Sequence, residues 1–179
     1  MRHASTSATR AAAFPLDEPL DEAGRSAAAR LARVVPSGAE VVSSPSLRCR
    51  ETATAAGLRP RLDPRLTECD FGRWAGSALD QIDADAAHAW MTDPDAAPHG
   101  GESLRVFAGR IAAWLDQGPD SATVITHGGV VRAAVVHALG APLDAFWRID
   151  VAPLSVTELH RHEARWTLTR LNHRVSAAG

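Results

Sequence analysis

The chain of 179 residues has no lysine or tyrosine, and it has only two cysteines. Cys49 and Cys69 are too few and too far apart for a disulfide framework or a paired-cysteine metal site. Two unpaired thiols suit a reducing compartment, which predicts a cytoplasmic protein. The polar amino terminus lacks the apolar core of a signal peptide, and no apolar run approaches the ~18 residues of a membrane span. We therefore expect no membrane partner.

Positive charge is also limited in kind, because every basic residue apart from histidine is arginine. The formal net charge is −2, so we expect no nucleic-acid partner. Any phosphate site must draw on arginine, whose planar fork suits phosphate geometry. The length and the 45% hydrophobic content predict one globular domain over residues 1–179. Nothing in the sequence assigns an oligomeric state.

Helical and strand-like patterns alternate along the chain. We predict helices over 21–35, 46–57, 101–118 and 130–140, short buried strands over 39–44 and 121–129, and two paired strands over 152–162 and 164–173. The first helix should bury Ala27, Leu31 and Val34, and the third should bury Leu104, Phe107, Ile111 and Trp114. The alternation predicts an α/β fold, a three-layer α/β/α sandwich with a mostly parallel central sheet.

The segment THGGVVR (126–132) places a histidine where a strand meets a helix. The strand would deliver His127 to its carboxyl end, where open α/β sheets bind ligands. Gly128 and Gly129 would then begin the next helix, and a helix N-terminus is a natural anion site. The alternative is a structural histidine beside a tight turn.

Two further segments carry charge at element boundaries. SSPSLRCRETA (43–53) offers Arg48 and Arg50, which cannot both face one point on a helix. TECDFGRWAG (67–76) offers Glu68, which could act as a general acid, with Asp70 as its rival. The alternative for each of these residues is a solvated surface charge, which is the more common role of a single charged residue.

These segments, with the opening RHAST (2–6), resemble in order the signature motifs of the histidine phosphatase superfamily, also called phosphoglycerate mutase-like. GES-L (101–104) and EPLDEAG (18–24) are similar to further family segments, so the resemblance covers nearly the whole chain. It selects Arg48 rather than Arg50 as the pocket arginine. Ala4 stands where the family usually has glycine.

The resemblance implies a metal-independent phosphatase with no cofactor. His3 would be the nucleophile and would form a phosphohistidine, while Glu68 would be the acid and base. His127 would share in catalysis and, with Arg2, Arg48 and Gly128, bind the phosphoryl group. The substrate would be a small phosphorylated metabolite, such as a sugar phosphate or α-ribazole phosphate. Phosphoglycerate-mutase-type transfer and non-catalytic phosphate binding remain alternatives.

The family also has a cap beside the pocket, which we expect as a small insertion around 77–100. Trp90 and His99 are its candidate substrate contacts. The stretch 74–104 holds six acidic residues and no arginine, which would favour a neutral or positive leaving group unless this is only a solvated acidic face. His160 and His162 lack a metal-site pattern.

The opening of the chain departs from the family pattern. Members carry an apolar strand before the first histidine, in the middle of the sheet, whereas here only Met1 precedes Arg2. The first strand is apparently truncated, and we expect the natural chain to start upstream. Without that strand, His3 should lie on a frayed end, where displacement of about 1 Å impairs catalysis.

Overall fold

The computed structural model describes residues 1–163 and 165–174. Three parallel strands form one sheet in the order β2-β1-β3, namely β1 (Val41–Ser43), β2 (Arg61–Leu62) and β3 (Thr123–Ile125). Two antiparallel strands, β4 (Ser155–His162) and β5 (Arg165–Arg174), form the second sheet. The parallel sheet with its helices confirms the α/β prediction, and the hairpin turns at Glu163 as expected.

The first three residues lie between these two sheets. On one side, the His3 amide donates to Thr126 at 2.8 Å and the Thr126 amide donates to Met1 at 2.9 Å. On the other side, the Arg2 amide donates to Ser155 at 3.2 Å. The segment thus occupies the central position expected of the first strand, although only an isolated bridge from Arg2 to Thr126 forms. His3 is paired on both sides, so the expectation of a frayed nucleophile was wrong.

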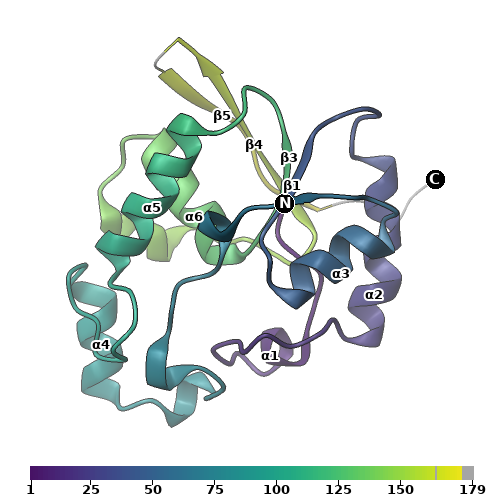
Figure 1. Ribbon diagram of the computed structural model, residues 1–179. Helices are drawn as coiled ribbons and strands as arrows, with labels where there is room; N and C mark the ends of the chain where they lie inside the picture. Colours follow the sequence, from purple (N-terminus) through teal and green to yellow (C-terminus); the bar gives the residue numbers. More distant parts are fainter. Residues whose placement is uncertain (164, 175–179) are drawn as a thin grey trace.

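Helices cover the strands from two sides, as Figure 1 shows. On one side lie α2 (Glu22–Ala28) and α3 (Leu47–Ala55), and on the other lie α5 (Leu104–Gln117) and α6 (Gly128–Ala138). Two shorter helices, α1 (Ser7–Arg10) and α4 (Ala84–Thr92), complete the fold. No helix in the described part of the chain is long and apolar enough to cross a membrane.

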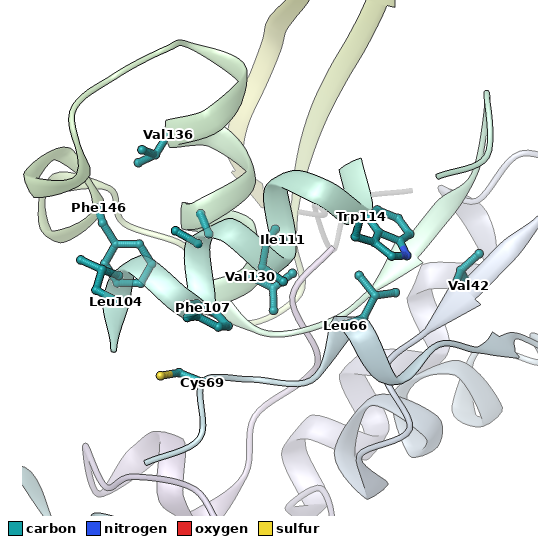
Figure 2. Close-up of a cluster of buried hydrophobic side chains, with 12 residues drawn as sticks. Val42, Leu66, Cys69, Leu104, Phe107, Ile111, Trp114, Val130, Val136 and Phe146 are labelled. Atoms are coloured by element: carbon teal, nitrogen blue, oxygen red, sulfur yellow. The ribbon is translucent and has the colours of Figure 1, made fainter. Parts of the chain in front are cut away.

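The main hydrophobic core lies between the sheet and α5 and α6 (Figure 2). Helix α5 buries the four predicted side chains, Leu104, Phe107, Ile111 and Trp114, because they recur at helical spacing. They pack with Val42 of β1 and with Val130 and Val136 of α6. The Ser103 hydroxyl accepts from the Val106 amide and so caps α5 at its start.

The first predicted helix is shorter than expected. Helix α2 ends at Ala28 and a 3-10 turn follows over Ala29–Arg33. Its buried face is Gly24, Ala28 and Leu31, while Val34 is exposed. A Cβ atom on Gly24 would collide with the Ser5 carbonyl, so the glycine allows α2 to approach the His3 segment closely. The buried face therefore includes Gly24 instead of Ala27 and Val34, because the close approach of α2 requires a residue without a side chain.

Candidate active site

His3 lies buried at the end of the short N-terminal segment, with only 5% of its surface exposed. Its Nδ1 donates to the Ala4 carbonyl at 2.7 Å, a geometry that leaves Nε2 unprotonated. Burial and the nearby Arg48 charge lower the pKa of the imidazole to about 3. His3 is therefore neutral near pH 7, with one nitrogen lone pair available as a nucleophile.

Ala4 links this segment to α3. Its amide donates to the Thr52 hydroxyl at 3.0 Å, and that hydroxyl donates to the Arg48 carbonyl at 2.7 Å. The Ala4 methyl group is fully buried with Leu20 and Ala28. One threonine thus couples the backbone of the His3 segment to the helix that carries Arg48.

Arg48 and His127 contact each other at the carboxyl ends of β1 and β3. The Arg48 Nη2 donates to His127 Nδ1 at 3.1 Å, and Nη1 donates to the Leu16 carbonyl at 2.8 Å. The His127 Nε2 then donates to the Ser44 hydroxyl at 2.8 Å. Arg50 is exposed and Arg48 is buried, so the two arginines separate as the helical geometry requires.

His127 is fully buried beside His3, with their ring centroids 5.3 Å apart. Burial and the Arg48 charge hold the pKa of His127 well below its usual range, so this ring is also neutral. Both ring nitrogens are engaged by protein groups. A direct contact to a phosphoryl oxygen would require one of these two bonds to be exchanged.

Arg2 supplies a second guanidinium group, which is half-buried and has a buried Nε. Its Nη1 donates to the Val151 carbonyl at 2.5 Å, and it lies against Gly128 at the start of α6. Among the described residues, neither the Arg2 Nε nor the Arg48 Nε has a hydrogen-bond partner. Buried donors without acceptors are costly, and an anionic ligand would satisfy them.

Glu68 lies across from these groups, on the loop after β2. Its carboxylate accepts from the Cys69 amide and from the Gly129 amide, each at 3.1 Å. The anion-binding start of α6 thus binds a side chain of the protein itself. Asp70 is exposed, and its carboxylate accepts from the Gly72 amide in its own turn.

Arg110 of α5 anchors the Glu68 loop. Its guanidinium group binds both carboxylate oxygens of Glu102, at 2.9 and 2.7 Å. It also donates to the carbonyls of Arg65 and Thr67, at 2.7 and 3.2 Å. The sequence pattern did not predict this clamp, although the GES-L segment marked the position of Glu102.

A cavity of about 410 Å³ opens beside Arg48 and Glu68. Trp90 and His99 are not among the residues that line it. They are buried, 9% and 1% exposed, in an aromatic cluster with Phe14 and Trp74. The geometry favours a structural role for both residues over the substrate contacts expected from the sequence.

None of the six acids of the 74–104 stretch lines the cavity, and four of them accept hydrogen bonds from other protein groups. Asp83 caps α4 at the Ala86 amide, and Asp95 pairs with Arg105 at 2.6 Å. Glu102 belongs to the Arg110 clamp. This arrangement gives no support to an acidic cap over the phosphate site and agrees with the alternative, a solvated acidic face.

The two neutral histidines predict a pH-dependent stability. In the unfolded chain each should titrate near ~6.5, whereas in the folded chain the pKa of His3 is about 3. Below pH ~6.5 the unfolded chain therefore binds more protons, so the free energy of unfolding falls as the pH is lowered. We expect a loss of about 1.4 kcal/mol per histidine for each pH unit below this point.

Urea unfolding at pH 7.5, 6.5 and 5.5 measures this loss. The carboxylates contribute little above pH ~5, because their ordinary pKa values lie near 4. The variant His3→Gln should show a shallower decline between pH 6.5 and 5.5. Equal stability of the unchanged protein at all three pH values would contradict the buried neutral state.

Gly129→Ala should displace the Glu68 carboxylate, because a Cβ atom at this position would collide with Oε1. If Glu68 is the general acid that the family resemblance implies, hydrolysis of alkyl phosphates should fall by about ten- to hundredfold, since a positioned acid contributes 10²–10⁴ in rate. Aryl phosphates, whose leaving groups need little protonation, should lose much less. Steady-state assays of both substrates measure the difference.

Gly109→Ala in α5 is the matched control, because no atom lies within 4 Å of its added Cβ. It should leave both activities unchanged. Equal losses for alkyl and aryl phosphates in Gly129→Ala would show that the substitution acts on something other than Glu68.

Comparison with known proteins places the chain in a family. The sequence profile of the histidine phosphatase superfamily (branch 1) matches residues 1–174. A glucosyl-3-phosphoglycerate phosphatase of Mycobacterium tuberculosis is 36% identical over 150 residues, which span 72% of this chain and 67% of that protein. Phosphoserine phosphatase 1 of Hydrogenobacter thermophilus is 26% identical over 172 residues, which span 88% of this chain and 82% of that protein.

A solved structure shows the same relationship. The native structure of mycobacterial glucosyl-3-phosphoglycerate phosphatase superimposes with a TM-score of 0.81 at 31% identity, covering 96% of each chain. The sequence profile and the superposition both extend over nearly the whole chain. It therefore belongs to the histidine phosphatase superfamily, in branch 1.

Proposed function

We propose that this chain hydrolyses phosphomonoesters of a small cytoplasmic metabolite through a phosphohistidine on His3, without a metal ion. One observation carries the proposal. A neutral histidine with an unprotonated Nε2 lies in the field of two guanidinium groups, and each of these has a buried Nε without a hydrogen-bond partner among the described residues. Such a group can attack phosphorus while the arginines stabilise the equatorial oxygens.

In the first step, the His3 Nε2 lone pair forms a bond to phosphorus and the ester P–O bond breaks. Glu68 gives its proton to the leaving oxygen. In the second step, Glu68 takes a proton from water, whose oxygen bonds to phosphorus as the N–P bond breaks. Inorganic phosphate leaves, and His3 is neutral again.

Arg2, Arg48 and the start of α6 at Gly128 would hold the phosphoryl oxygens. His127 would contribute through its bond to Arg48, which fixes the guanidinium plane. Direct contact between His127 and the phosphoryl group would follow if Arg48 or Ser44 released the ring. This arrangement meets the need of phosphoryl transfer for positioning and charge stabilisation.

Trapping the intermediate tests the proposal. The protein is mixed with radiolabelled phosphomonoesters in EDTA, quenched in base and digested. We expect acid-labile label on the peptide that contains His3, together with release of inorganic phosphate. Phosphoryl exchange between positions of one substrate without phosphate release would indicate a mutase. Phosphate binding without labelling or turnover would indicate a binding protein.

A further inference from the structure

The cavity beside Arg48 and Glu68 is where the group attached to the phosphate must lie if the proposed function holds. Its lining away from these two residues is largely apolar or uncharged, with Pro15, Pro45, Ser46 and Thr67 among its members. Asp17 adds a carboxylate. The charge of this lining decides which leaving groups are accepted.

Two acidic side chains lie near Arg48, and one of them is part of the cavity lining. Asp17 is exposed, and its Oδ1 accepts from the Leu47 amide at 2.7 Å, which fixes the carboxylate at the start of α3. Glu18 lies deeper, with one oxygen 4.0 Å from the Arg48 Nη1. Neither Glu18 oxygen has a hydrogen-bond partner among the described residues. Two carboxylates, those of Asp17 and Glu18, are thus present without Glu68, which the proposed first step uses in its protonated form.

Positive charge is scarce by comparison. Within the part of the chain that the structure describes, Arg48 is the only cation that lines the cavity. It is already bound to His127 and the Leu16 carbonyl, and the proposed mechanism uses it for the phosphoryl group. Arg10 and Arg25, from the same N-terminal region, pair with Asp21 and Glu51. A second anionic group on a substrate therefore has no cation in the lining to bind.

We infer that the enzyme selects phosphomonoesters whose leaving group is neutral or positively charged, and discriminates against those that carry a carboxylate. A leaving-group carboxylate would lie near Asp17 without a counter-charge, and such repulsion is a common source of specificity. Hydroxyl groups would instead meet Ser46 and Thr67. The inference rests on the proposed function, and it separates this chain from relatives whose names include phosphoglycerate and phosphoserine.

Two matched compounds test the inference. Glycerol 3-phosphate and 3-phosphoglycerate differ only in a hydroxymethyl group against a carboxylate, and phosphoethanolamine adds a cationic case. Each is assayed as a substrate and as a competitive inhibitor of aryl phosphate hydrolysis, so that a poor substrate still reports its binding. We expect kcat/KM, or affinity, to be at least about tenfold higher for the neutral and cationic compounds, a modest charge-repulsion effect.

Asp17→Asn identifies the source of the selectivity, because asparagine keeps the acceptor for the Leu47 amide and removes the charge. The preference for glycerol 3-phosphate over 3-phosphoglycerate should shrink severalfold. Asp144→Asn, an exposed acid that does not line the cavity, is the control and should keep the full preference.

The outcomes distinguish the inference from the function on which it rests. Equal or better use of 3-phosphoglycerate, or a preference unchanged in Asp17→Asn, would overturn the inference while leaving a phosphatase. Absence of hydrolysis of every compound, aryl phosphate included, would overturn the proposed function instead.

Discussion

His3→Ala should reduce phosphate release by at least about a thousandfold, because the first chemical step needs a nucleophile and displaced nucleophiles alone cost about a hundredfold. The His3 side chain is buried and its Nδ1 donates to the Ala4 carbonyl, which holds the imidazole in one orientation that alanine does not replace. Activity is measured as inorganic phosphate released from an aryl phosphate, in EDTA, at pH 7.

His3→Gln is a second variant, since it keeps more of the side-chain volume and tests whether the loss arises from a cavity. Circular dichroism and urea unfolding check that both proteins fold. His160→Ala is the matched control, because this histidine lies on the exposed part of β4. Activity within tenfold of the original in both folded His3 variants would exclude a phosphohistidine route.

Arg48→Ala should have the second-largest effect, a loss of about 10²–10³ in kcat, which is typical when one transition-state donor is removed. The substitution also deprives His127 of its donor and leaves Glu18 without its nearby positive charge. We therefore expect a parallel loss of stability, about 1–3 kcal/mol for the unsatisfied buried groups. Steady-state kinetics and urea unfolding measure the two losses separately.

Arg48→Lys helps to separate charge from geometry. Lysine supplies one compact charge and cannot reach both His127 and a phosphoryl oxygen as a planar fork can. It should therefore recover stability better than kcat. Arg50→Ala is the control, since Arg50 is exposed on the same helix. A loss in Arg50→Ala as large as in Arg48→Ala would contradict the assignment of the pocket arginine.

The residues that the structure brings together are those that the sequence placed at element boundaries. His127 follows β3, Arg48 opens α3 after β1, and both come to the same sheet edge because the two strands are parallel. The sequence pattern was sufficient to predict that these residues meet, because neighbouring parallel strands end at the same edge of the sheet. The buried face of α5 was predictable for a similar reason, because its apolar spacing is regular.

Other features depend on contacts between distant segments, which local patterns do not specify. Trp90 and His99 look like cap residues in the sequence, yet Trp90 packs against Phe14 from the N-terminal segment, and His99 packs against Trp74 and Trp90. Asp17 reaches the cavity only because a loop folds over α3. The Arg110 clamp joins α5 to a loop more than forty residues earlier. Each of these required the tertiary structure.

Because Arg2 and His3 are hydrogen-bonded to strands on both sides, the position of His3 depends on both sheets staying closed. Amide protons exchange with solvent only when their hydrogen bonds open, and the His3 and Arg2 amides bind Thr126 and Ser155 on opposite sides. Opening of the β4–β5 hairpin would remove one side of this support while the three-stranded sheet stays closed. Heat inactivation should then follow the exchange of hairpin amides and precede global unfolding.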